Sequence, residues 1–133
     1  MSTAESARRY RTTAVNTATP GQLVLMLFDG ALRFMDTAVA GFDEASLSKR
    51  LEIVHNNLVK TQNILRELQA TLDRAGNADF SDRMFALYDF MIAQLVEANL
   101  RKDPKPIHTV ARLLGQIRAA WAEMLSQSCS EAA

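Results

Sequence analysis

The sequence predicts an all-α protein, an antiparallel four-helix bundle with an N-terminal extension, folded as a single domain over residues 1–133. Glycine and proline are scarce, with 5 and 3 copies in 133 residues, as expected of long helices with few breaks. Four long stretches repeat apolar residues at steps of three and four, which is the period of a helix. Short connections join these stretches, and short connections favour antiparallel neighbours.

The first helix is predicted to begin at Pro20 and to end near Ala40. Thr19 precedes it as an N-cap, and Gln22 stands three residues later, so the two form a capping box. Pro20 takes the first helical position, where its missing N–H costs nothing. Gly41 suits the position just past the end of a helix.

The first helix carries more apolar surface than one bundle core can use. Every residue from Leu23 to Phe28 is apolar, and a helix that is apolar on all sides must be covered on all sides. Either another segment of the chain or a partner covers the surplus, or the helix is the central core helix of a tight bundle. Gly30 predicts the close approach of a neighbouring helix, and Asp29 and Arg33 are spaced to form an ion pair.

The second helix is predicted over residues 47–72. Its apolar residues form a heptad seam, which is typical of helices that pack at shallow angles. The seam consists of Leu47, Leu51, Val54, Leu58, Thr61, Leu65, Leu68 and Leu72. Ile53 and Ile64 fall off this seam with Asn57 between them, in a strip that is either a flank of the bundle or half of a groove.

The third helix is predicted over residues 80–100, and the fourth from Pro104 to Ser126. Asp103 can cap the fourth helix, with Pro104 in its first position. The inward residues of the third helix are Phe80, Met84, Leu87, Met91 and Leu95, broadened by Tyr88, Ile92 and Val96. Those of the fourth are Ile107, Val110, Leu114, Ile117, Trp121 and Met124.

The two ends of the chain lack this apolar pattern. Residues 1–18 are predicted to form a mobile polar arm and residues 127–133 a frayed tail. Tyr10 and Val15 are the large apolar anchors of the arm. The arm is therefore either a disordered terminus or a flap whose two anchors dock on the surplus apolar surface of the first helix.

Composition narrows the classes of partner and the compartment. Lysine plus arginine equals aspartate plus glutamate at 15 each, so the net charge is zero, and charge offers no case for a nucleic-acid or membrane partner. The single cysteine excludes an internal disulfide. The longest apolar run is far below the roughly 18 residues of a membrane helix, and no signal peptide is visible. We expect a cytoplasmic protein.

The sequence shows no catalytic motif, and we expect no enzyme, metal or cofactor. Glu52 and His55 form one Glu-x-x-His motif, whereas a di-metal bundle needs two, and the second histidine, His108, has Lys105 at the glutamate position. His55 also suggests an alternative, a histidine phosphotransfer-type four-helix bundle. Such domains usually place lysine and glycine three and four residues after the histidine, where this chain is aliphatic.

Several stretches, taken in order, carry a resemblance to a known family. They are Tyr10, Thr17-Ala18-Thr19-Pro20-Gly21-Gln22-Leu23, Met26-Leu27-Phe28-Asp29-Gly30-Ala31, Leu87-Tyr88-Asp89-Phe90-Met91 with Ala98-Asn99 and Asp103 after it, and Ala120-Trp121. Their order and spacing resemble the flagellar secretion chaperone FliS family. The resemblance implies a cytoplasmic bundle that binds the C-terminal segment of flagellin, prevents its premature polymerisation and delivers it to the flagellar type III secretion apparatus.

For such a chaperone we predict a partner-binding groove on and beside the first helix, because a bound amphipathic helix would cover the surplus apolar surface. The predicted contact residues are Tyr10, Val15, Leu23, Met26, Leu27, Ile53, Asn57, Ile64, Tyr88 and Met91. Leu27 and Met91 also fit core positions. Components of the flagellar export gate are the other implied partners. We expect a monomer or weak homodimer. A self-assembling structural bundle is a third alternative, which predicts stable oligomers without a partner.

Overall fold

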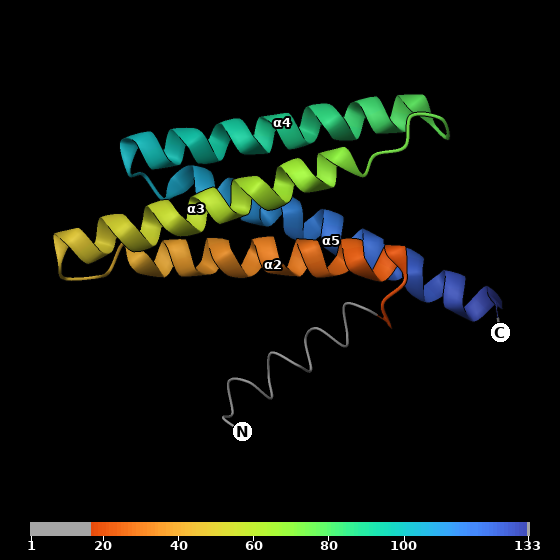
Figure 1. Cartoon of the computed structure of the whole chain (residues 1–133), viewed down its shortest axis with the longest axis horizontal. Coiled ribbons are helices and arrows are strands. Elements are labelled where there is room, and N and C mark those ends of the chain that lie inside the picture. The colour runs from red at the N-terminus through yellow and green to blue at the C-terminus, as the bar shows by residue number, and fades with distance from the viewer. Residues whose placement is uncertain (1–16, 133) are drawn as a thin grey trace, which may run out of the picture.

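The computed structural model describes residues 17–132, and in that part of the chain it contains four long α-helices and no strand. The helices are α2 (Pro20–Gly41), α3 (Leu47–Ala70), α4 (Ala78–Arg101) and α5 (Lys105–Ala132). Successive helices run antiparallel and are joined by short connections (Figure 1). The predicted all-α four-helix bundle is confirmed.

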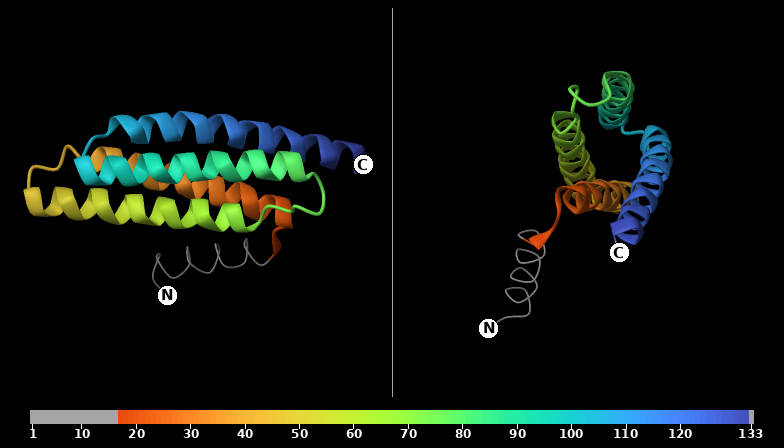
Figure 2. Two further views of the ribbon diagram at one scale, coloured as in Figure 1. Left: turned by 90° about the horizontal axis from the view of Figure 1, so that it is seen from above. Right: turned by 90° about the vertical axis from the view of Figure 1, so that its right-hand side faces the viewer.

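The four helices form a ring around a shared core. Each helix packs against its two neighbours, α2 on α3 and α5, and α4 on α3 and α5. Seen end-on, the helices occupy the corners of a square (Figure 2). The contact between α2 and α3 is the most extensive of the four, so α3 is the main cover of the apolar first helix.

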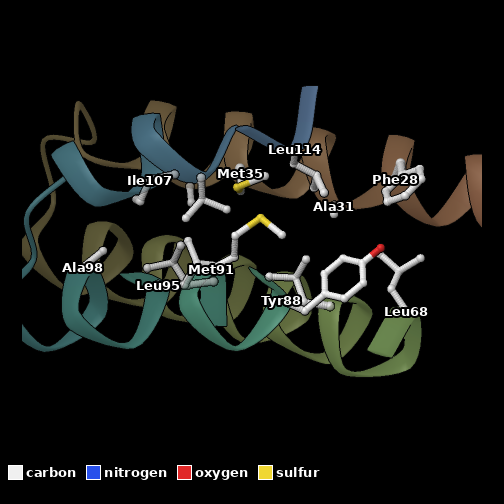
Figure 3. Packing of buried hydrophobic residues seen from close by; sticks show 14 of the residues in the cluster. Phe28, Ala31, Met35, Leu68, Tyr88, Met91, Leu95, Ala98, Ile107 and Leu114 are labelled. Carbon is white, nitrogen blue, oxygen red and sulfur yellow. The ribbon is translucent and has the colours of Figure 1, made fainter. Parts of the chain in front are cut away.

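Apolar side chains from all four helices fill the interior (Figure 3). The fully enclosed large side chains include Phe28, Met35, Leu58, Leu65, Leu68, Met91, Leu95, Ile107 and Leu114. Burying each of these stabilises the fold by about 1.5–3 kcal/mol before entropy is counted. The predicted seams of the second, third and fourth helices supply most of this core, as steps of three and four require.

Side-chain caps begin the helices much as the sequence predicts. The capping box on α2 is present: Gln22 N donates to Thr19 Oγ1 at 3.2 Å, and Thr19 N donates to Gln22 Oε1 at 3.0 Å. At the start of α5, Lys105 N donates to Asp103 Oδ1 at 3.0 Å. The cap on α5 is therefore the predicted one, although the helix begins one residue after Pro104.

The ends of the helices differ from the prediction because the helices are staggered. Leu47, Leu51, Phe80 and Met124 are predicted to face inward but are exposed. The first turns of α3 extend past the connection between α4 and α5, and the first turns of α4 extend past the end of α3 (Figure 1). The fourth helix is also longer than predicted, since α5 continues to Ala132 instead of ending near Ser126.

The predicted ion pair between Asp29 and Arg33 does not form. Asp29 instead accepts a hydrogen bond from Arg118 Nε of α5, at 2.9 Å to its Oδ1. This hydrogen bond and the charge of Asp29 raise the pKa of Arg118. The ends of the same two helices are joined by Trp121, whose indole N–H donates to Gly21 O at 2.9 Å.

Two glycines of α2 face α3 at different distances. A Cβ at Gly30 would lie 3.4 Å from Ile64 Cδ1, which is ordinary contact, whereas one at Gly41 would lie 2.6 Å from Ile53 Cγ2. Ile53 is branched at Cβ and cannot easily turn away. The closest approach of α3 to α2, predicted at Gly30, therefore occurs at Gly41, where there is no room for a side chain.

This difference predicts opposite effects of the same substitution. Gly30→Ala should raise the free energy of unfolding by about 0.5–1 kcal/mol, because alanine is the better helix former and its methyl group has room. Gly41→Ala should lower it by about 1–3 kcal/mol through overpacking. Urea denaturation followed by circular dichroism measures both. Shifts of the same sign in the two variants would contradict this account.

Candidate partner-binding surface

The apolar run that begins α2 is only partly covered by the rest of the bundle. Phe28 is enclosed in the core, where its ring meets Trp121 edge-on at 6.3 Å between centroids. Met26 is 38% exposed. The other residues of the run, Leu23, Val24, Leu25 and Leu27, are half-buried. The surplus predicted from the sequence is therefore present as accessible apolar surface.

Most of the predicted contact residues lie along one line, where α2 meets α3. Ile64 faces Gly30, and Ile53 faces Gly41. Leu23 and Leu27 share the face of α2 that carries Gly30, because they precede it by seven and three residues. We call the line formed by Leu23, Leu27, Ile53, Asn57 and Ile64 the α2/α3 seam. All of these side chains are half-buried.

Polar and aromatic groups complete the middle of the α2/α3 seam. Asn57 Nδ2 donates to Ile53 O at 2.8 Å, which holds the amide along its own helix. Lys60 Nζ lies 5.3 Å from the ring centroid of Phe34, a cation–π arrangement across the two helices. Arg33 Cζ lies 5.9 Å from the same ring centroid. The seam thus offers apolar side chains interrupted by one amide and two cations.

Met26 lies at the outer edge of the α2/α3 seam. It is turned about 100° around the helix from Leu27, but it precedes Gly30 by four residues and so shares a face with it. Its neighbours on that outer face, Gln22 and Arg33, are exposed. An exposed thioether among polar groups is an adaptable apolar contact.

Tyr88 and Met91 occupy the core instead of a surface. They are 3% and 0% exposed, and they project from α4 into the interior (Figure 3). This burial is at odds with their predicted role as partner contacts. Burial also raises the pKa of Tyr88 to about 12, because the phenolate would lose its hydration. The remaining two predicted contacts, Tyr10 and Val15, lie outside the described residues.

The sequence reasoning missed a second partly apolar surface, on the outer side of α4. Phe85, Val96 and Leu100 are exposed there and Ile92 is half-buried. They are spaced by seven, four and four residues, which places them on one face of the helix. This spacing, offset from the inward residues of α4, is the feature of the sequence that indicates the surface. Ile92 also packs against the core, as predicted, whereas Val96, which is predicted to broaden the inward face with it, is exposed.

A pocket of about 440 Å³ opens beside this surface, between α3 and α4. We call it the α3/α4 pocket; its lining residues are His55, Val59, Gln62, Val96, Asn99, Leu100 and Lys102. His55 Nδ1 lies 2.9 Å from Asn99 Nδ2, within hydrogen-bond distance. His55 is thus engaged in a contact between helices, and Leu58, where a phosphotransfer domain usually has lysine, is buried in the core.

Within residues 17–132, no group of three or more histidine, cysteine, aspartate or glutamate side chains is placed to hold a metal ion. None of the four helices has a long enough apolar stretch to span a membrane.

Comparison with known proteins agrees with the family resemblance seen in the sequence. A family model described as "Flagellar protein FliS" matches residues 2–128. The chain is 38% identical over 116 residues to the flagellar secretion chaperone FliS of Bacillus subtilis, covering 87% of this chain and 83% of that one. It is 34% identical over 118 residues to the protein of the same name from Salmonella typhimurium, covering 84% and 80%. The corresponding Escherichia coli protein is 33% identical over 119 residues, with the same coverage.

The burial of Tyr88 predicts a loss of stability in alkali. Its pKa is about 12 in the folded protein and near its ordinary value of 10 once unfolded. The protonated Tyr88 therefore contributes its full share to the free energy of unfolding below pH 10, and this share is lost as the pH rises towards 12. Between pH 9 and pH 11 the wild type should lose roughly 1–1.5 kcal/mol more than Tyr88→Phe. Urea denaturation of the wild type and of Tyr88→Phe at both pH values measures this difference. An equal loss in wild type and Tyr88→Phe would count against it.

Proposed function

Because the chain belongs to the FliS family of flagellar secretion chaperones, we propose that it binds the C-terminal segment of flagellin in the cytoplasm. Binding blocks premature polymerisation of flagellin, and the complex is delivered to the export gate of the flagellar type III secretion apparatus. The chaperone acts by covering an apolar surface, so the proposal requires neither catalysis nor a cofactor.

The partly uncovered apolar run of α2 is the observation that supports flagellin binding most directly. Met26 is exposed, and Leu23 and Leu27 keep accessible surface at the α2/α3 seam. A segment that must later assemble into a filament carries apolar surface, which water disfavours while the segment is free. A bound amphipathic helix would lay its apolar face along the seam, which would remove the apolar surface of the helix and that of the seam from water.

The energetics favour a long interface over a single short helix. A segment that folds on binding loses conformational entropy, and this cost is subtracted from the gain of burial. Each 100 Å² of buried apolar surface contributes only about 2.5 kcal/mol. The α2/α3 seam with Met26 would therefore be one part of the contact with flagellin.

The predicted flap would protect the same surface in the empty chaperone. Tyr10 and Val15 precede α2 in the sequence, so a flap carrying them begins next to Leu23. The protein is expected to remain a monomer or weak homodimer, because the flap and the partner compete with self-association. Stable oligomers of the purified protein in sedimentation velocity would instead favour the self-assembling bundle.

The first test compares two methionines of similar exposure. Met26 is 38% and Met124 is 44% exposed, but only Met26 adjoins the proposed surface. Met26→Gln should weaken binding of full-length flagellin by about fivefold, since it replaces apolar contact of about 1 kcal/mol. Met124→Gln should leave the affinity unchanged. Isothermal titration calorimetry measures both.

Flagellin lacking its last few dozen residues provides the partner control for this titration. It should no longer bind, because the proposed contact lies in the removed segment. Retained binding of the truncated flagellin would refute the proposal that its C-terminal segment is recognised. Equal affinities of the Met26 and Met124 variants would instead remove α2 from the interface.

Deleting residues 1–16 tests the flap. The bundle should stay folded, because its capping box and core lie outside this segment. Binding of an apolar dye should rise and the affinity for flagellin should change, since the flap and the partner would share one surface. If dye fluorescence and affinity both match the full chain, residues 1–16 do not form a flap.

A further inference from the structure

The α3/α4 pocket lies on the opposite side of α3 from the α2/α3 seam, at the same level along the bundle. His55 follows Ile53 by two residues, and Gln62 precedes Ile64 by two. Each pair is therefore separated by about 200° around the helix. A partner that occupies the seam could reach the pocket by crossing α3.

Gln62 leaves a polar group in the pocket without a partner. It is 7% exposed and lines the pocket, yet no described residue forms a hydrogen bond with its side chain. Since no fully enclosed polar side-chain atom of the described residues lacks a partner, the amide of Gln62 keeps some accessible surface. Such an amide can donate and accept, which is what a peptide backbone requires.

Lys102 supplies a positive charge to the same pocket from a backbone conformation that favours glycine. It ends α4 with φ 51° and ψ 49°, the left-handed region, and it is the only non-glycine residue with positive φ in the described part of the chain. Its ammonium group donates a hydrogen bond to Asn99 Oδ1 and forms no ion pair with a described residue. A side chain kept at a strained position often has a function.

Asn99 fixes how these groups face the pocket. Its Oδ1 accepts from Lys102, so its Nδ2 faces His55 Nδ1 at 2.9 Å. In the tautomer whose Nδ1 accepts from this amide, the proton of the imidazole is on Nε2. Asn99 acts as a positioning residue that holds the lysine cation at the pocket wall and orients the imidazole, whose N–H is a second donor.

The remaining walls of the pocket are aliphatic. Val59, Val96 and Leu100 line it, and Leu100 is 77% exposed. None of the lining residues is acidic, so the charge of Lys102 is not balanced within the pocket. A volume of about 440 Å³ accommodates a large side chain with its neighbours.

From these groups, and resting on the proposed function, we infer that the α3/α4 pocket binds a second anchor of the flagellin C-terminal segment. The anchor is a large aliphatic side chain with a carboxylate close to it in the same segment. The aliphatic group lies against Val59, Val96 and Leu100. The carboxylate pairs with Lys102, and Gln62 hydrogen-bonds to the backbone of the segment.

One continuous segment can reach both surfaces. The ridge of α3 between them carries the exposed polar residues Glu52, Asn56 and Asn63, which need no cover. A helix is about 10–12 Å wide, and an extended chain advances about 3.3–3.6 Å per residue. A crossing of fewer than about ten residues therefore connects the seam to the pocket.

Substitution of Lys102 separates binding from stability. Lys102→Gly relieves the positive φ, so the urea midpoint of unfolding should stay equal or rise. The affinity for the flagellin C-terminal segment should nevertheless fall by about tenfold, as expected for a lost charged hydrogen bond. Lys102→Met should weaken binding similarly, whereas Lys105→Met, the same charge change three residues away and outside the pocket lining, should not.

Gln62→Leu provides an independent variant of the pocket. It removes the unpartnered amide while keeping an apolar side chain next to the core, so the fold should be retained. Affinity should fall about fivefold, which corresponds to one hydrogen bond. Calorimetry with the isolated C-terminal segment of flagellin measures all four variants under the same conditions.

The carboxylate is identified by a double-mutant cycle. Each aspartate and glutamate of the flagellin segment is changed to its amide and titrated against wild type and Lys102→Met. One position should weaken binding to the wild type but have no further effect on Lys102→Met. If the wild type binds while the pocket variants bind equally well, or no acidic position couples to Lys102, this inference is overturned and the proposed function stands. If the wild type does not bind the segment, the proposed function itself fails.

Discussion

The fit of α2 against its two neighbours is the constraint on which the rest of the structure depends. Gly41 lets Ile53 of α3 approach within a distance that a methyl group would obstruct, whereas a Cβ added at Gly21 would meet only the end of a flexible side chain, Leu125 Cδ2 of α5, at 2.6 Å. Phe28 and Met35 are fully enclosed in the core while Met26 remains exposed. The close packing that builds the core thus also limits how much of the first helix the bundle can cover.

The residual surface divides by chemistry into two parts on either side of α3. The α2/α3 seam is dominated by half-buried leucine and isoleucine, so it suits an amphipathic partner held by apolar burial. The α3/α4 pocket combines aliphatic walls with Lys102, His55 and an unpartnered Gln62, so it suits a segment that also presents a charge and a backbone. Apolar burial is non-directional, whereas the hydrogen bonds of the pocket depend on orientation. A partner that uses both would gain affinity from the seam, and the pocket would fix the position of the bound segment along the bundle.

The core and the surfaces share residues of the same helices, which links stability to binding. Ile53 packs against Gly41 and also borders the seam, so its substitution changes the fold and the surface together. Lys102 both ends α4 and lines the pocket, but glycine suits its positive φ, so Lys102→Gly alters the pocket without a cost in stability. Met26 and Gln62 are different, because neither contributes an apolar group to the enclosed core, and they are better positions at which to study binding alone.

The sequence by itself determined the helices, their caps and most of the core, because these depend on local spacing. The Thr19–Gln22 capping box and the Leu58, Leu65 and Leu68 seam follow from residues a few positions apart. It also carried the family resemblance. Only the tertiary structure decided which apolar residues are covered, because coverage depends on the stagger of neighbouring helices. Leu47 and Phe80 fit the inward period yet project past the end of a neighbour, and Tyr88 is enclosed. Long-range partners such as Arg118 for Asp29, and the grouping of His55, Asn99 and Lys102, arise from the packing of distant segments, which helical periodicity does not encode.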